Sequence, residues 1–159
     1  MTEQATIPTV QRTVTVAAPV ERAFQVFTSS FSSWWPSDYH IGSADYAGAV
    51  MEARAGGRWY ERGTDGSECD WGRVLTWEPP HKLVLAWHIN GEWQYDPDPE
   101  HASEVVVTFT PEGGMTRVDL EHRRLERHGD QADAVRKGVS ESGGWGDILL
   151  RYADAVAGK

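Results

Sequence analysis

A succession of β-prone segments separated by turn signals fills the middle of the chain, and it limits the possible fold more than any other feature. Valine, threonine and aromatic residues dominate these segments, whereas Asp-Gly, Pro-Pro and Gly-Gly pairs lie between them. Strand-length segments joined by such turns are typical of antiparallel neighbours. The predicted strands cover residues 49–54, 57–62, 70–77, 82–89, 104–110 and 115–122, and residues 89–103 are predicted to form a polar loop. The pattern therefore predicts an antiparallel meander.

Helical periodicity flanks these strands on both sides. After a further predicted strand at 9–16, residues 20–27 repeat apolar side chains three and four positions apart, which predicts a short helix. A second short helix is predicted over 28–35, and it ends before Pro36 because the residue preceding a proline avoids the helical region. Near the C-terminus the same spacing over 131–156 predicts one long amphipathic helix.

Glycines at positions 143, 144 and 146 interrupt this C-terminal pattern. Each costs up to about 1 kcal/mol in a helix relative to alanine, so their presence needs a reason. Close packing against the sheet or against Trp34 and Trp35, room for a ligand, and a kink in the helix are the interpretations that the sequence leaves open.

Together these elements predict the α+β class. A curved antiparallel sheet of about six to seven strands would wrap around the long C-terminal helix, with two short helices after the first strand. No repeat, linker or low-complexity tract divides the chain. Residues 1–159 are therefore predicted to form a single domain with its core at about 9–157.

Charge and cysteine content exclude several classes of function. The chain has 24 acidic and 15 basic residues and a net charge of −9, which argues against nucleic acid or a membrane as a partner. Cys69 is the single cysteine, which excludes a disulfide framework and favours a cytoplasmic protein with an inert, buried thiol. The six histidines show no metal-ligand spacing, so neither a metal nor a cofactor is predicted.

Strand periodicity singles out two polar residues, Glu61 and His122. Alternation in the last predicted strand places His122 on the same face as Val118 and Leu120, which is the inward face. Glu61 shares a face with Trp59 in the same way. A carboxylate near an imidazole could act in acid–base catalysis, and the alternative interpretation is a structural ion pair or a hydrogen-bonded core histidine.

The chain contains eight tryptophans, enough to fill a core or to line a wide cavity. The adjacent Trp34 and Trp35 cannot face the same way, so one is predicted to enter the core and the other to face a cavity mouth or the C-terminal helix near its glycines. His40 follows them and is predicted to lie at the cavity rim rather than to act as a catalyst. Whether Trp71 and Trp77 point inward depends on a possible β-bulge between them.

Several motifs follow one another in a recognisable order. They are VAAPVERAFQVFT at 16–28, WWP at 34–36, GGRWYERGTDG at 56–66, WGRVLTWEPPHKLVLAW at 71–87, TRVDLEH at 116–122 and GGWGDILLRY at 143–152. In these motifs the chain resembles the SRPBCC (START-like, helix-grip) superfamily, and within it bacterial proteins similar to the C-terminal domain of the activator of heat-shock protein 90 ATPase. The resemblance implies a helix-grip fold with a cavity between sheet and long helix, and a link to the stress response. It covers only one of the activator's two domains, so a chaperone partner is doubtful.

The leading functional hypothesis is a binding protein, not an enzyme, that holds a small hydrophobic or aromatic ligand in this cavity. The predicted ligand-binding residues are Trp35, Tyr39, Trp59, Glu61, Trp87, His122, Trp145, Leu149 and Tyr152. The alternative is a cyclase or hydrolase in which Glu61 and His122 reach one substrate atom, aided by Tyr39 or Tyr152. A third hypothesis is an interaction domain, such as a chaperone partner or a homodimer, which would show a filled cavity and an apolar outer patch.

Overall fold

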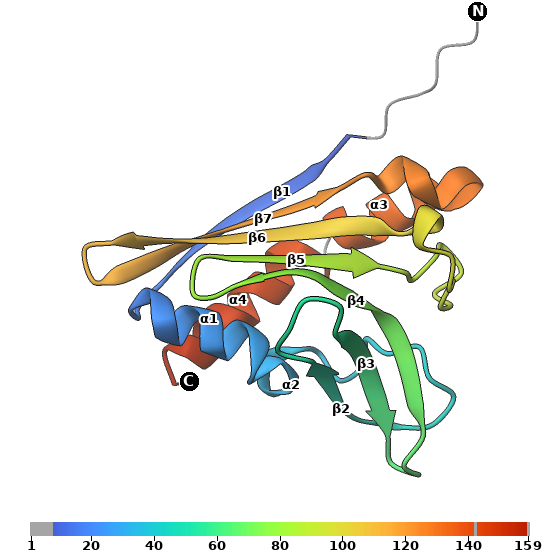
Figure 1. Ribbon diagram of the computed structural model, residues 1–159, viewed down its shortest axis with the longest axis horizontal. Coiled ribbons are helices and arrows are strands. Elements are labelled where there is room, and N and C mark those ends of the chain that lie inside the picture. The colour runs from blue at the N-terminus through green and yellow to red at the C-terminus, as the bar shows by residue number, and fades with distance from the viewer. Residues whose placement is uncertain (1–7, 142, 159) are drawn as a thin grey trace, which may run out of the picture.

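The computed structural model describes residues 8–141 and 143–158, so the ends of the predicted domain and Ser142 lie outside the described residues. Within them, one antiparallel sheet of seven strands has the order β1-β7-β6-β5-β4-β3-β2 (Figure 1). The strands are β1 Val10–Val16, β2 Tyr46–Met51, β3 Arg58–Gly63, β4 Glu68–Glu78, β5 Lys82–Trp87, β6 Ser103–Glu112 and β7 Met115–Arg123. The helices are α1 Val20–Thr28, α2 Phe31–Trp34, α3 Ala132–Ser140 and α4 Trp145–Val156, with 3₁₀ turns η1 Pro99–His101 and η2 Leu125–Gln131. The predicted α+β helix-grip fold is confirmed.

The sheet follows the predicted meander from β2 to β7, and β1 joins it at the far edge. Val10 pairs with His122 and Val16 with Thr116, so the first and last strands of the chain lie side by side. The predicted strand at 49–54 begins earlier, because Tyr46 already pairs with Gly63 of β3. Alternation in β7 is as predicted, with Thr116, Val118, Leu120 and His122 all buried.

Two bulges in β4 decide the orientation of its tryptophans. The register against β3 shifts at Trp71, and the register against β5 shifts at Leu75. Each extra residue reverses the alternation of side chains along the strand. As a result Trp71 is buried, Leu75 is exposed, and Trp77 packs against Phe24 with ring centroids 5.1 Å apart.

The predicted single helix over 131–156 is wrong, because the structure contains α3 and α4 with a break between them. Gly143 lies in this break with φ at +85°, a conformation that a residue with a side chain rarely adopts. A Cβ at this position would also lie 2.5 Å from the hydroxyl oxygen of Tyr39. The glycines therefore end one helix and allow the next to begin, which agrees with the interpretation of a kink.

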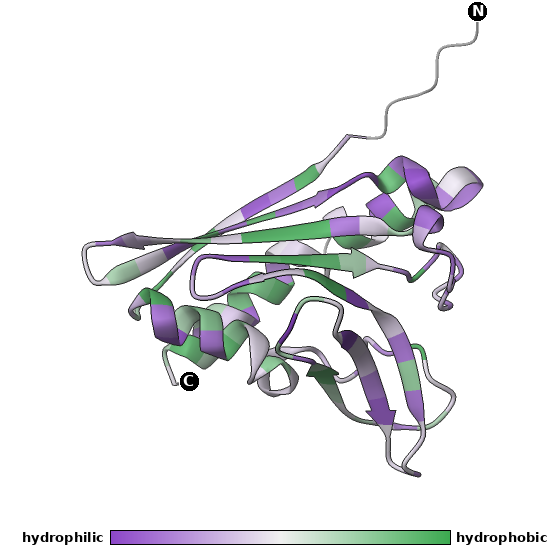
Figure 2. Cartoon of the chain, viewed as in Figure 1, coloured by the Kyte–Doolittle hydropathy of each residue, from purple (hydrophilic) through white to green (hydrophobic). Residues whose placement is uncertain are grey.

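Helices α1 and α4 lie together on one face of the sheet (Figure 1). Phe27 of α1 is the centre of an aromatic cluster there, with ring centroids 5.0 Å from Trp34, 5.8 Å from Phe109 and 5.2 Å from Tyr152. Hydrophobic residues also run along β5 and much of β6 in the middle of the sheet (Figure 2). None of the described helices combines the length and hydropathy needed to cross a membrane.

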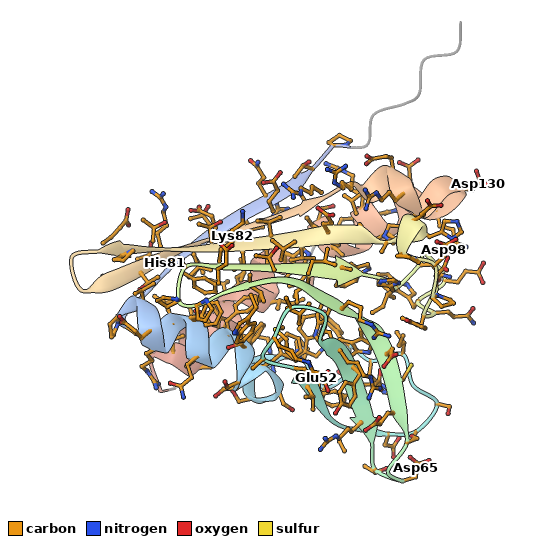
Figure 3. The ribbon with its side chains drawn as sticks, in the orientation of Figure 1. Glu52, Asp65, His81, Lys82, Asp98 and Asp130 are labelled. Carbon is orange, nitrogen blue, oxygen red and sulfur yellow. The ribbon has the colours of Figure 1, made fainter. Side chains whose placement is uncertain are left out.

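Charged side chains lie around the periphery of the molecule (Figure 3). Asp65 is at the tip of the β3–β4 hairpin, whereas Asp98 and Asp130 are at the opposite end, near η1 and η2 (Figure 3). These three aspartates therefore do not share one surface patch.

Trp34 and Trp35 diverge as predicted. Trp34 is buried in the core, where its Nε1–H donates to the carbonyl of Val26 at 2.9 Å. Trp35 turns the other way, and its Nε1–H donates to the carbonyl of Tyr39 at 2.8 Å. The Trp35 ring lies 6.0 Å from that of Trp145, so the predicted contact with the C-terminal helix near its glycines is confirmed.

Candidate functional site

A pocket of about 460 Å³ lies between the segment that follows α2, the end of β5 with its following loop, and the junction of α3 and α4. Its lining residues are Trp35, Asp38, Tyr39, His40, Ile41, Trp87, Ile89, Trp93, Gly138, Val139, Gly143, Gly144, Trp145 and Ile148. The break between the two helices forms one side of the pocket, so the glycines also leave room at this site. Small-molecule sites typically have volumes of roughly 300–1,000 Å³.

Three indoles form fixed, flat walls inside the pocket. Trp145 lies between Trp35 and Trp87, with ring centroids 6.0 and 5.9 Å away. The Nε1–H of Trp87 donates to the carbonyl of Ile89 at 2.8 Å, and that of Trp145 donates to Nδ1 of His122 at 3.1 Å. Since each indole N–H is already bonded within the protein, including that of Trp35, these walls offer mainly apolar ring surface to a ligand.

Trp93 forms the outer wall of the pocket and comes from the loop predicted at 89–103. Its backbone has φ at 59°, and the residue is 46% exposed. The indole lies against Gly138 of α3, where a Cβ would be 2.5 Å from Cη2 of the ring. A glycine in the middle of α3 is unfavourable for the helix, but it allows this close contact.

A histidine–carboxylate pair lies at the wall of the pocket. Nδ1 of His40 is 3.2 Å from Oε2 of Glu61, and the two side chains are 26% and 2% exposed respectively. Oε1 of Glu61 accepts three further hydrogen bonds, from the backbone N–H groups of Ile41 and Gly42 at 2.6 and 3.0 Å and from Nε1 of Trp71 at 2.9 Å. Burying a carboxylate is costly unless donors surround it, and this one is surrounded by them.

Cys69 lies opposite Glu61 in the β3–β4 ladder. Burial raises the pKa of its thiol, and the charge of Glu61 raises it further. A thiol with a raised pKa is a poor nucleophile at neutral pH, which agrees with the prediction of an inert cysteine. The prediction that Cys69 is buried is wrong, because the residue is only partly buried.

His122 belongs to a different network, although it also faces inward. Its Nε2 is 2.7 Å from Oγ of Ser103, and the same oxygen is 2.8 Å from Nε2 of His128. Burial lowers the pKa of His122 to about 3, and nearby His128 adds to this effect. Burial also lowers the pKa of His128 to about 4. Both histidines are therefore neutral at physiological pH.

The candidate catalytic pair of Glu61 and His122, which belonged to the alternative enzyme hypothesis, is not formed. β3 and β7 are separated in the sheet by β4, β5 and β6, and each of the two residues bonds to partners of its own. His122 has both ring nitrogens engaged and is fully buried, as expected for a hydrogen-bonded core histidine. Glu61 instead reaches the pocket through His40, which sequence analysis had placed only at the rim.

The predicted ligand-binding residues divide into two groups. Trp35, Tyr39, Trp87 and Trp145 line the pocket. Trp59, Glu61, His122, Leu149 and Tyr152 are buried and do not line it. Tyr152, for example, donates its hydroxyl hydrogen to the carbonyl of Ala23 at 2.6 Å within the core, and burial raises its pKa.

Sequence reasoning missed other lining residues, chiefly Trp93, Ile89 and Gly138. Trp93 lies in a polar, proline-containing stretch whose course periodicity does not reveal. A glycine within a helical pattern was the one available signal for Gly138, because it marks a place where another group approaches closely. Among the described residues, no group of three or more His, Cys, Asp or Glu side chains could hold a metal ion.

Comparisons with known proteins agree with this architecture. An anthrahydroquino-γ-pyrone synthase, Txn09, solved in complex with SUM, is 46% identical over 94% of this chain and 97% of its own, with a TM-score of 0.66. CalC from Micromonospora echinospora, a self-sacrificing resistance protein, is 35% identical over 95% of both chains, with a TM-score of 0.70. A Nitrosomonas europaea protein, at 15% identity and a TM-score of 0.66 over 94% of both chains, shares the fold. No curated protein matches the chain.

The family comparison covers most of the domain. Residues 17–151 match the family described as activator of Hsp90 ATPase homolog 1-like protein. This range includes α1, α2, strands β2 to β7, α3 and the first half of α4. The chain therefore belongs to the activator of Hsp90 ATPase homolog 1-like family, within the SRPBCC superfamily.

Proposed function

We propose that the protein binds a planar, polycyclic aromatic small molecule in the pocket between the sheet and the C-terminal helices. The observation that carries the proposal is the indole lining formed by Trp35, Trp87, Trp93 and Trp145. Flat, rigid rings favour flat, rigid ligands, because stacking brings large apolar areas into contact at little cost in side-chain entropy. Asp38 and His40 supply the few polar groups that would orient such a ligand.

The relatives support a ligand of this class. Txn09 is named as a synthase of an anthrahydroquino-γ-pyrone, which is a fused-ring aromatic product, and it matches nearly the whole of this chain. CalC is named as a resistance protein and also matches nearly the whole chain. A pocket for a fused-ring compound is compatible with either role.

The exposed surface gives less support to an interaction domain. Such a domain calls for a filled cavity and a contiguous apolar patch, but the pocket here holds about 460 Å³. The exposed large apolar side chains lie on separate elements, with Leu75 on β4, Met115 on β7 and Leu150 on α4. The other two, Tyr39 and Trp93, line the pocket itself.

Isothermal titration calorimetry tests the proposal with two probes of different shape. Alizarin, a dihydroxyanthraquinone, is planar, whereas dodecanoate is apolar and flexible. We expect alizarin to bind at one site per chain and dodecanoate to bind much more weakly. Trp93→Ala removes one exposed wall and should weaken alizarin binding by about tenfold.

Trp77→Phe is the matched control, because Trp77 packs against Phe24 outside the pocket. It should leave the affinity for alizarin unchanged. Equal losses in the two variants, or dodecanoate binding as tight as that of alizarin, would contradict a planar aromatic site. Absence of binding by both probes would contradict the ligand-binding function altogether.

A further inference from the structure

We propose that His40, oriented by Glu61, is a general base that removes a proton from an acidic hydroxyl group of the ligand bound in the pocket. The inference rests on the proposed function, because the hydroxyl group would belong to that planar aromatic ligand. The inference adds an activity to the proposed binding function, because the protein would catalyse an acid–base isomerisation and not only hold its ligand. His40 would be the catalytic residue, and Glu61 a positioning residue that acts through it.

The hydrogen bonds of Glu61 assign one oxygen to His40. Oε1 accepts from Ile41, Gly42 and Trp71, all at 3.0 Å or less. Oε2 has one partner among the described residues, which is Nδ1 of His40 at 3.2 Å. Since Glu61 is almost fully buried, its carboxylate cannot move without breaking these bonds, and it holds the imidazole in one orientation.

This arrangement fixes the tautomer of His40. When neutral, its Nδ1 carries the hydrogen that is donated to Glu61, so Nε2 carries the lone pair. Nε2 makes no hydrogen bond within the described part of the chain, and His40 is one of the residues that line the pocket. His122 shows the contrast, because both of its nitrogens are bonded and it is fully buried.

Acidic residues are the charged groups near His40 at the pocket. Glu61 of β3 is the nearest charge, and Asp38 of the same segment also lines the pocket. The ring centroid of Tyr46 is 6.0 Å from that of His40, and burial raises the pKa of Tyr46. Burial also raises the pKa of Cys69, which lies beside Glu61. No described lysine, arginine or second histidine lines the pocket. The imidazolium would therefore face carboxylates and no competing cation.

The reaction needs no co-reactant. The O–H bond of the ligand breaks, its proton moves to Nε2 of His40, and the electron pair stays on the ligand oxygen. That oxygen then forms a bond to an electrophilic carbon conjugated with a carbonyl group in the same molecule, and the displaced π electrons move to the carbonyl oxygen. The His40 imidazolium returns the proton to the resulting enolate, so the product is an isomer of the ligand.

Nuclear magnetic resonance of the ligand-free protein provides the first test, because two-bond ¹H–¹⁵N correlations identify the imidazole tautomer. We expect His40 to carry its hydrogen on Nδ1, and we expect Glu61→Gln to shift it toward the usual Nε2–H form. A wild-type His40 that carries its hydrogen on Nε2 would overturn the proposal whether or not any ligand binds.

The second test follows the ionisation of bound alizarin, whose absorption spectrum changes when a hydroxyl group loses its proton. The apparent pKa of the bound dye should be at least about one unit lower in the wild type than in His40→Gln. Glu61→Gln should reduce this difference. Gly42→Ala should do the same without removing the carboxylate, because its Cβ would lie 2.8 Å from Oε2 of Glu61.

The outcomes separate this inference from the proposed function. Alizarin that binds with similar affinity to wild type and His40→Gln, but ionises at the same pH in both, overturns the general base and leaves the binding site intact. Failure of alizarin to bind overturns both. His101→Gln is the control for a histidine outside the pocket, and it should leave the ionisation of the bound dye unchanged.

Discussion

Moderate acid should destabilise this protein through His122 and His128, which share Oγ of Ser103. Burial lowers the pKa values of these histidines to about 3 and about 4, whereas both would titrate near 6.5 in the unfolded chain. As the pH falls below 6.5, the unfolded chain therefore binds protons that the folded protein does not. The contribution of the two neutral histidines to the free energy of unfolding is fully present above pH 6.5. It is lost progressively as the pH falls from about 6.5 toward the pKa values of the folded protein, about 4 and about 3.

The size of the effect follows from the linkage of protonation to folding. One pH unit below its unfolded pKa, each histidine lowers the free energy of unfolding by about 1.4 kcal/mol. Both together contribute about 3 kcal/mol between about pH 7.5 and about pH 5.5. For a domain of this size, that loss corresponds to a fall in Tm of roughly 6–12 °C.

Urea unfolding followed by tryptophan fluorescence at the two pH values measures this loss. His128→Gln removes one titrating group, and its amide can still bond to Ser103, so the pH-dependent loss should fall by about half. The control is His81→Gln, because His81 is exposed at the turn between β4 and β5 (Figure 3). The reasoning is refuted if His128→Gln retains the full wild-type loss, or if His81→Gln reduces it equally.

Two further substitutions separate the pocket from the core. In Gly138→Ala, the better helix propensity of alanine should stabilise α3 by up to about 1 kcal/mol, while the new Cβ displaces Trp93 and weakens alizarin binding. Thermal unfolding measures the first effect and calorimetry the second. An unchanged affinity for alizarin would contradict the role given to Trp93. In Tyr152→Phe, loss of the hydroxyl bond to the carbonyl of Ala23 should cost about 1 kcal/mol of stability at unchanged alizarin affinity. A Tyr152→Phe variant that loses affinity without losing stability would show that Tyr152 touches the ligand after all.

The inward face of each strand could be predicted because alternation is a local property. His122 and Glu61 are buried as their neighbours at two-residue spacing indicate. Alternation does not predict which residues form hydrogen bonds with these two side chains. His40 is 21 residues from Glu61 and lies in a segment without regular structure, so the path of that segment over the end of the sheet decides the pairing.

The helical pattern at the C-terminus shows a similar limit. Three-four spacing correctly marked a face that packs on the sheet, since Val135, Val139, Leu149 and Val156 are all buried. The spacing continues through the break, however, and only the left-handed backbone of Gly143 and the nearby Tyr39 hydroxyl show where the helix ends. Two helices with the same apolar face look like one helix in the sequence.

By itself the sequence determined the α+β class, the antiparallel meander, the inward faces of the strands and the divergence of Trp34 and Trp35. These depend on periodicity and on the chemistry of turns, which act between residues close together in the chain. Only the tertiary structure decided which indoles share a pocket, that Trp93 covers it, and that Glu61 bonds to His40 instead of approaching His122. These contacts join distant segments, and the bulges, helix break and loop conformations that place them depend on how the whole core packs.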